Sequence, residues 1–473
     1  MRRLTVIGAT RLLFLMCFLS SSGYVTAQVM SLDDCVSLAM QSNKQIQATR
    51  HMVSQYEHIQ KLAKAFYFPN VNLTAADTYG TLSASTIMDI ATPVGTFTAQ
   101  TLQDMFPSNI DDAMRDQLAQ EVTQFVRPLN PEVGFKMKNL LTAGISLEQP
   151  VYMGGMISTA NRMGKIGVKM ALQTDKLARE QIIVEVFEAY QLLVKAKEME
   201  VVAHQYDSLL NQIEHDVKSA VKHGMASHND ELKVAVKKSD AELKIRQAEN
   251  GIRLARMNLC QLIGKPLDSM IDPVPDQDSD MVEPVDKDAS ATSRTEYQLL
   301  DLKSQLAWER VRLEKSAYLP KLGVIFNVGM IDGIEMLNSK LFRHNLNLSV
   351  GAVLRVPIFH AGETRHKVAA AKEALHQELL RQDDLTDKMN LDLQQQANNV
   401  DEARLELQLR KRNLEQCEEN LRTSRNAYSV GMESLSDLLT AQVLWQQAYA
   451  ELVESRYQAK VKIMKWRKAA GRI

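Results

Sequence analysis

Few residues of the chain have the type and spacing that catalysis or metal binding requires. The sequence contains no Gly-x-Ser-x-Gly, no His-Glu-x-x-His, no P-loop and no Cys-x-x-Cys, which are motifs of hydrolases, zinc proteases, nucleotide-binding proteins and redox proteins. His223 and His228 flank a predicted turn, but this spacing does not place them on one helix face, and solvated side chains are the commoner outcome. We therefore expect no enzyme, no cofactor and no metal.

Asp437 is the acidic residue with the most specific position. It follows Gly431 closely and falls in the first turns of a predicted helix. A carboxylate at such a position is usually stabilised by the helix dipole, as an ordinary helix-start acid. A second role for Asp437 depends on the resemblance described below.

Long helices must position these residues. Between Gly362 and Tyr428 an apolar residue recurs at every seventh position, at Leu393, Val400, Leu407, Leu414, Leu421 and Tyr428. This is the seam of a coiled coil, which needs partner helices, and we expect an oligomer to supply them. One unbroken helix over this stretch would be roughly 100 Å long.

The same stretch occurs twice in the chain. The interval from Pro150 to Pro357 equals the interval from the turn residue Gly224 to the turn residue Gly431. Two rods of equal length are therefore predicted. We expect a first repeat at 28–264, an acidic linker at 265–293 and a second repeat at 294–473. Turns at residues 224 and 431 are the tips of the two rods.

Alternating apolar and polar residues predict four strands, two in each repeat. The predicted strands are 70–80, 139–149, 321–330 and 345–356. Any one of them alone would suit a soluble sheet, but four strands of membrane-crossing length, each next to a rod, favour a membrane. Four strands cannot close a barrel, and open edges cannot face lipid, so we expect three copies to form twelve strands.

The remaining features bound the location and partners of the chain. Residues 1–27 have the basic start, apolar centre and small residue of a secretory signal peptide, and residues 81–131 are expected to be a long loop with a short helix. The 56 basic residues balance the 57 acidic ones, which argues against nucleic-acid binding.

Three cysteines remain in the predicted mature chain, namely Cys35, Cys260 and Cys417. Counting along the rods places Cys35 and Cys260 at the same level, roughly 50 Å below the membrane. We therefore hypothesise a Cys35–Cys260 disulfide, within or between chains, in a compartment that permits it. The alternative is three buried, inert thiols.

The motifs together resemble the TolC-like outer-membrane efflux family over nearly the whole mature chain. The resemblance rests on Tyr67-Phe68-Pro69, on the strand that ends at Pro357 before Gly362, and above all on the stretch from Tyr428 to Gln442. It implies a mainly α-helical homotrimer with a twelve-stranded outer-membrane β-barrel, continued by a periplasmic α-helical coiled-coil tunnel. The implied partners are a periplasmic adaptor protein, an inner-membrane pump of RND or ABC type, and outer-membrane lipids.

The resemblance also implies roles for residues at the tips. Asp437 falls at an acidic ring that narrows the tunnel mouth, and Tyr428 and Glu433 fall where links close it; Asp230 is assigned to the same gate. The small tip residues Gly224, Ser227, Gly431 and Ser434 are expected to dock the adaptor. Two departures from the family pattern, Glu433 in place of a basic residue and Thr440 in place of a second acid, indicate that closure uses other contacts.

The function that follows is a passive export duct for small molecules such as drugs and toxic compounds. One alternative is an outlet for type I protein secretion. An alternative of another class is a non-porous periplasmic scaffold or adhesin stalk, which would have no need of four membrane-length strands.

Overall fold

The computed structural model describes five stretches of the chain, and these form two compact units. The described stretches are 28–78, 136–274, 290–335, 345–359 and 361–473. Each unit takes segments from both predicted repeats. The predicted signal peptide and the predicted loop at 81–131 lie outside the described residues.

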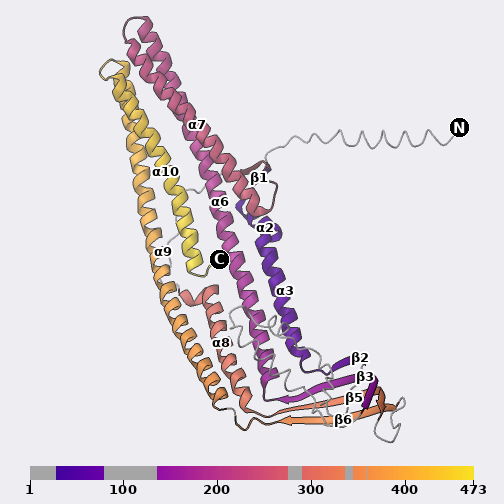
Figure 1. The fold of residues 1–473 in the computed structure, drawn as a ribbon. Helices are drawn as coiled ribbons and strands as arrows, with labels where there is room; N and C mark the ends of the chain where they lie inside the picture. The colour runs from indigo at the N-terminus through magenta and orange to yellow at the C-terminus, as the bar shows by residue number, and fades with distance from the viewer. Residues whose placement is uncertain (1–27, 79–135, 275–289, 336–344, 360) are drawn as a thin grey trace, which may run out of the picture. The chain divides into compact units, whose positions relative to one another are not determined.

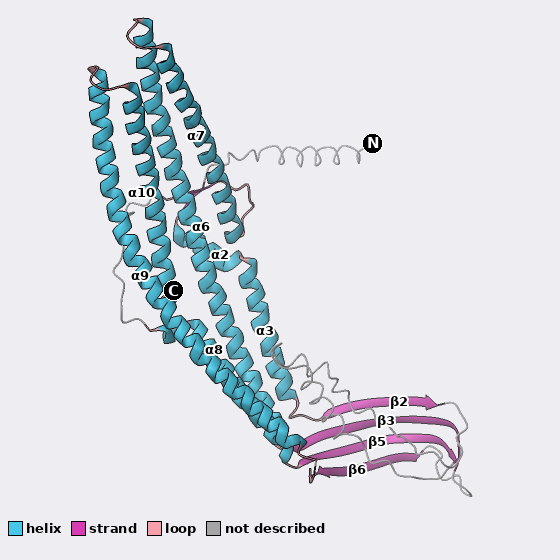
Figure 2. Ribbon diagram, turned by 60° about the vertical axis from the view of Figure 1, so that its left-hand side comes forward, coloured by secondary structure: helices cyan, strands magenta, loops and turns pink. Residues whose placement is uncertain are grey.

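One unit contains a four-stranded antiparallel sheet (Figures 1 and 2). Its strands, in spatial order, are β2 (Asn70–Thr78), β3 (Lys136–Met153), β5 (Lys321–Glu335) and β6 (Asn345–Arg355). Strand β3 continues past Pro150, where the sequence predicted its end. A register shift between Pro150 and Tyr152 accommodates the proline, since a bulge tolerates a residue that cannot donate to the ladder.

The two faces of this sheet differ in polarity. The apolar face exposes large side chains on both outer strands, with Leu73 79%, Leu348 65% and Val350 68% exposed. The other face carries a polar row of directly opposed residues, one per strand: Asn72, Ser146, Asn327 and Ser349. The period of two along each strand separates the faces, as the sequence predicted.

Helices of the same unit pack beside one another in two small clusters. Helices α3 (Lys44–Ala65) and α8 (Thr295–Lys315) contribute Ala63 and Leu313 to a cluster with Met163 of α6 (Met156–Lys222). A second cluster joins α8 to α9 (Glu363–Ser429) through Val311, Ala371 and Leu375. Arg162 donates to the Glu309 carboxylate at 2.8 Å and ties α6 to α8.

The other unit is a bundle of helical hairpins. It contains α2 (Leu32–Ser42), the C-terminal parts of α6 and α9, and the return helices α7 (His228–Ile263) and α10 (Leu435–Ala469). Ser31 caps α2 in a capping box with Asp34. Helices α6 and α9 have 67 residues each, so the two rods are equal in length.

The seam on α9 is buried within the chain itself, so our expectation that an oligomer supplies its partner is wrong. Val400 is fully buried in a cluster with Trp466, and Leu407 packs in a cluster with Leu452. Helix α10 carries its own heptad of buried residues, at Leu438, Trp445, Leu452, Ala459 and Trp466. The return helix therefore supplies the complementary seam.

A short parallel sheet was not predicted. Strand β1 (Gln28–Met30) pairs with β4 (Ile271–Pro273), which falls inside the predicted linker. The Tyr190 hydroxyl donates to the Met30 carbonyl at 3.2 Å and accepts from the Val274 amide at 3.0 Å. These contacts tie the start of the described chain to the segment after α7. Every described helix is too short or too polar to cross a lipid bilayer.

Cys35 and Cys260 lie in one hydrophobic cluster, and each is completely buried. Both are free thiols in the structure. Burial raises the pKa of Cys35 to about 11 and also raises the pKa of Cys260, so both thiols are protonated and unreactive at neutral pH. Their pairing in the cell stays a prediction.

Candidate functional site

The two tips are built from the same local motifs. At the first, the Gly224 amide donates to the Val221 carbonyl at 3.0 Å and the Met225 amide donates to the Ala220 carbonyl at 2.8 Å. At the second tip, the corresponding donors are Gly431 and Met432, at 3.0 and 2.9 Å. This is the Schellman ending of a helix, and it requires a left-handed residue, which glycine supplies.

Each tip then starts its return helix with a capping box. The Ser227 hydroxyl accepts from the Asp230 amide, and the Asp230 carboxylate accepts from the Ser227 amide; Ser434 and Asp437 repeat this arrangement. The four predicted docking residues therefore all have a structural role in the turns. A Cβ added at Gly224 or Gly431 would meet nothing within 4 Å, so space does not require glycine at these positions. The positive φ values of 72° and 75° do require it.

The two acidic caps differ in their electrostatic surroundings. Asp230 uses its second oxygen to bind Lys233 at 3.0 Å, and its pKa is lowered by the hydrogen bond from Ser227 and then by Lys233. Asp437 binds Ser434 through Oδ2 alone, at 2.6 Å to the hydroxyl, and its side chain is exposed. Among the described residues no cation pairs with the Asp437 carboxylate, whereas Lys233 pairs with the Asp230 carboxylate.

The remaining predicted gate residues lie against the second tip and the first return helix. Tyr428 is half-buried. Burial raises its pKa most, and the carboxylates of Asp230 and Asp216 raise the pKa further. Tyr428 and Asp230, from different hairpins, are therefore close enough to interact. Glu433 accepts from the Ser424 hydroxyl at 3.2 Å through Oε1, while its buried Oε2 has no hydrogen-bond partner among the described residues.

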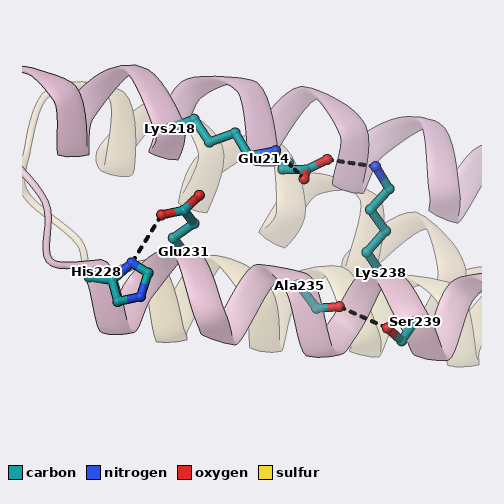
Figure 3. A network of polar contacts seen from close by, with 7 residues as sticks. All are labelled: Glu214, Lys218, His228, Glu231, Ala235, Lys238 and Ser239. Atoms are coloured by element: carbon teal, nitrogen blue, oxygen red, sulfur yellow. Dashed lines mark hydrogen bonds and ion pairs between the residues drawn. The ribbon is translucent and has the colours of Figure 1, made fainter.

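Charged residues join α6 to α7 near the first tip (Figure 3). Glu214 accepts from Lys218 on its own helix and from Lys238 on the antiparallel helix, both at 2.6 Å. These two hydrogen bonds lower the pKa of Glu214, and the bond from Lys218 has the larger effect. The hydrogen bond to Glu214 raises the pKa of Lys238. The network joins one carboxylate to two lysines and does not pair a nucleophile with a proton acceptor as catalysis requires. We therefore interpret it as a link between the two helices.

The two histidines near the first tip have separate partners. His223 Nδ1 lies 2.8 Å from the Ser219 carbonyl, and His228 Nδ1 lies 3.2 Å from Glu231. Over the stretches that the structure describes, no group of three or more His, Cys, Asp or Glu side chains could hold a metal ion. Nothing in this geometry brings His223 and His228 to a common ligand.

Two residues that the sequence reasoning did not assign stand out at the tips. Met225 and Met432 occupy equivalent positions and are 78% and 85% exposed. Each donates only its backbone amide to the Schellman motif, so the turn does not require its side chain. A methionine follows the turn glycine in both repeats, and this repetition in the sequence could have marked the two residues as candidates.

Known proteins support this fold over nearly the whole chain. The model of the family described as outer membrane efflux protein matches residues 298–472. Comparison with curated protein sequences finds no match. Solved structures match at low sequence identity, which establishes the fold.

Three of these structures are outer-membrane proteins. The outer membrane protein VceC of Vibrio cholerae is 13% identical with a TM-score of 0.69, and the match covers 93% of this chain and 96% of that one. The CmeC outer membrane channel of Campylobacter jejuni is 16% identical with a TM-score of 0.68, covering 93% and 85%. The open state of the MtrE outer membrane channel of Neisseria gonorrhoeae is 14% identical with a TM-score of 0.70, covering 93% and 88%.

The fold over nearly the whole chain is the fold of these outer-membrane proteins. Residues 298–472 of the chain belong to the family of outer membrane efflux proteins. The fold class, location and family predicted from the sequence are confirmed, and so is the prediction that the chain is not an enzyme. The description of the matched family as efflux proteins favours the export duct over the non-porous stalk.

Proposed function

We propose that the chain is the outer-membrane duct of a tripartite efflux system that exports small molecules. One combination of features carries this proposal. The chain has a sheet with an exposed apolar face, and it has two helical hairpins whose long helices are equal in length and end in matching tips. A sheet of this kind suits lipid contact, and rods of this length suit a periplasmic span. The duct itself is passive, and the pump supplies the energy.

The assembly that this function needs is a homotrimer. Among the described residues the sheet has four strands, fewer than the eight or so of the smallest membrane barrels, so these strands in a single copy would leave both edges open to lipid. Three copies would provide twelve strands. The same three copies would bring three Asp437 side chains around one axis.

The proposed partners are a periplasmic adaptor at the tips and, through it, an inner-membrane pump of RND or ABC type. Since Gly224, Ser227, Gly431 and Ser434 are needed for the turns, we assign the side-chain contact with the adaptor to Met225 and Met432. Exposed methionines are flexible and polarizable, and they adapt to a partner surface at little cost. The small residues around them leave the approach open.

Dye efflux from intact cells tests this function. Cells that lack the chain should accumulate a fluorescent pump substrate, and the wild-type gene should restore export. Met225→Gln combined with Met432→Gln should restore trimers but not export, because these substitutions leave the backbone hydrogen bonds of both tips in place. Leu232→Gln, at another exposed apolar position of α7, is the control and should export normally. Equal dye accumulation in cells with and without the chain would contradict an efflux function.

A further inference from the structure

Two short motifs at the helical end of the sheet each carry an exposed lysine and an exposed tyrosine. In the first, Lys64 and Tyr67 lie at the end of α3, just before β2. In the second, Lys315 and Tyr318 lie at the end of α8, just before β5. Both lysines are exposed, and the tyrosines are 46% and 51% exposed. Packing in the core therefore does not explain why the pair occurs twice.

The backbone sets each tyrosine beside its lysine. The Tyr67 amide donates to the Lys64 carbonyl at 3.0 Å, which closes a turn of three residues. Tyr318 ends a short 3-10 helix, η2 (Ser316–Tyr318), whose N-cap is Lys315. Side chains three residues apart in such turns lie one above the other. Each motif thus presents an ammonium group and a phenol ring on the same side.

The two lysines have charge to offer to a ligand. Within the described part of the chain, the ammonium groups of Lys64 and Lys315 form no hydrogen bond and no ion pair. The residues just before them are anchored, because Ala63 and Leu313 are buried in one cluster. The two ammonium groups are therefore carried on fixed helix ends at the same end of the sheet.

An aromatic band and an apolar surface adjoin these lysines. Besides Tyr67 and Tyr318, the same end of the sheet exposes Tyr152 and Phe359, at 45% and 83%. Each of the four strands thus has an exposed aromatic side chain at this end. The exposed apolar face of the sheet begins directly beyond, with Val71 63% exposed. Tyrosine rings prefer the depth of lipid headgroups, between the water and the apolar interior of a bilayer.

We infer that Lys64 with Tyr67, and Lys315 with Tyr318, bind the phosphate groups of anionic phospholipids in the periplasmic leaflet. This inference rests on the proposed function, which sets the apolar face of the sheet in the outer membrane. Lysine is a flexible point charge that suits a phosphate, and its apolar stem can lie along the membrane surface. A free phosphate ion would have no use for the aromatic band and the apolar strands beside the lysines, whereas a lipid contacts all three.

Lipid binding by the full-length protein in mild detergent tests this inference. Native mass spectrometry measures the Kd for a phosphatidylglycerol, which is anionic, and for a phosphatidylcholine with the same acyl chains, which has no net charge. The test variant is Lys64→Gln combined with Lys315→Gln. The matched control is Lys165→Gln combined with Lys169→Gln. It removes the same charge from exposed positions of α6 in the same unit, roughly 14 and 20 Å from the start of that helix.

We expect the test variant to bind phosphatidylglycerol about fivefold more weakly at each site, the effect of one lysine near an anionic membrane surface. The control should bind it as the wild type does, and phosphatidylcholine should not distinguish the variants. Lys64→Arg combined with Lys315→Arg keeps both charges and should also bind as the wild type does.

Two results would overturn the inference. One is equal binding of phosphatidylglycerol by the test variant and the wild type, and the other is equal weakening in the test and control variants. Displacement of phosphatidylglycerol by an equal concentration of inorganic phosphate would assign the lysines to a free anion and overturn the lipid. In each case the proposed function stands if the wild-type protein conducts as a trimer. Wild-type protein that forms no conducting species would overturn the proposed function and this inference together.

Discussion

At the residue scale, the two tips differ in the charge that each leaves exposed. The Asp230 carboxylate is bound by Lys233, whereas within the described part of the chain the Asp437 carboxylate has only its capping contacts with Ser434. Three exposed carboxylates around one axis would attract cations, as acidic rings do in cation channels. Asp437→Asn should therefore lower the cation-to-anion permeability ratio severalfold in bilayer recordings.

Asp230→Asn is the matched control for this prediction. Asparagine at either position keeps an oxygen that can accept from the serine of the capping box, so both helix starts should remain intact. Selectivity should change little with Asp230→Asn. An equal loss of selectivity in the two variants, or none with Asp437→Asn, would return Asp437 to the role of an ordinary helix-start acid.

Glycine at the end of α7 combines backbone conformation with close packing. Gly264 has a φ of 72°, and a Cβ added there would lie 2.7 Å from the Ser42 hydroxyl of α2. Ser42 also donates to the Ile263 carbonyl, so it cannot easily move away. Gly264→Ala should lower the free energy of unfolding by about 3 kcal/mol, as strain and overpacking add.

Gly224 separates these two effects. It has the same φ of 72° but open space around its Cβ position, so Gly224→Ala should cost only about 1 kcal/mol, from the left-handed conformation. Urea unfolding followed by circular dichroism compares the two variants. Equal losses of stability would show that Ser42 does not crowd Gly264.

Cys35 and Cys260 permit a direct chemical test at the same scale. They share a fully buried cluster, and burial raises the pKa of each thiol. If the predicted disulfide forms during folding in the cell, a non-reducing digest of alkylated, freshly extracted protein should contain the two peptides joined. Recovery of both as alkylated free thiols would leave them as inert core residues.

At the scale of elements, the seam of α9 joins two helices of one hairpin. Leu407 is 6% exposed and packs against α10, whereas Leu409, two residues later, is 52% exposed. Leu407→Ala should lower the unfolding free energy by about 3 kcal/mol through the cavity it leaves. Leu409→Ala should cost less than about 0.5 kcal/mol.

Thermal unfolding of the two purified variants at equal protein concentration makes this comparison. If Leu409→Ala were the more destabilising substitution, the exposed side of α9 and not the hairpin would hold the principal helix contact. That exposed side of α9 would then need a partner from another copy.

The same elements show what the sequence could predict. The heptad predicted the long helix of α9 correctly, but a seam does not say whether its partner is the same chain or another. The second heptad, from Leu438 to Trp466, carried that information because a hairpin brings the two helices together at high effective concentration. The pairing of β1 with β4 was not predictable, since each strand has three residues and no period to detect.

At the scale of the whole molecule, duplication determined most of the fold. Equal spacing of the prolines and glycines predicted equal rods, and the structure gives both 67 residues. The motifs that carry the duplication are local, because Schellman turns and capping boxes depend on a few adjacent residues. The positions of the tip residues were predictable for that reason. The ion pair between Asp230 and Lys233 was not, because it depends on side-chain geometry.

Single-channel conductance of the purified protein tests the central claim most directly. A trimeric duct predicts discrete current steps of uniform size in planar bilayers, from a species that native mass spectrometry identifies as a trimer. The steps should be more cation-selective from wild-type protein than from Asp437→Asn. A purified trimer that inserts into bilayers without passing current, or a species that remains monomeric in mild detergent, would contradict the account.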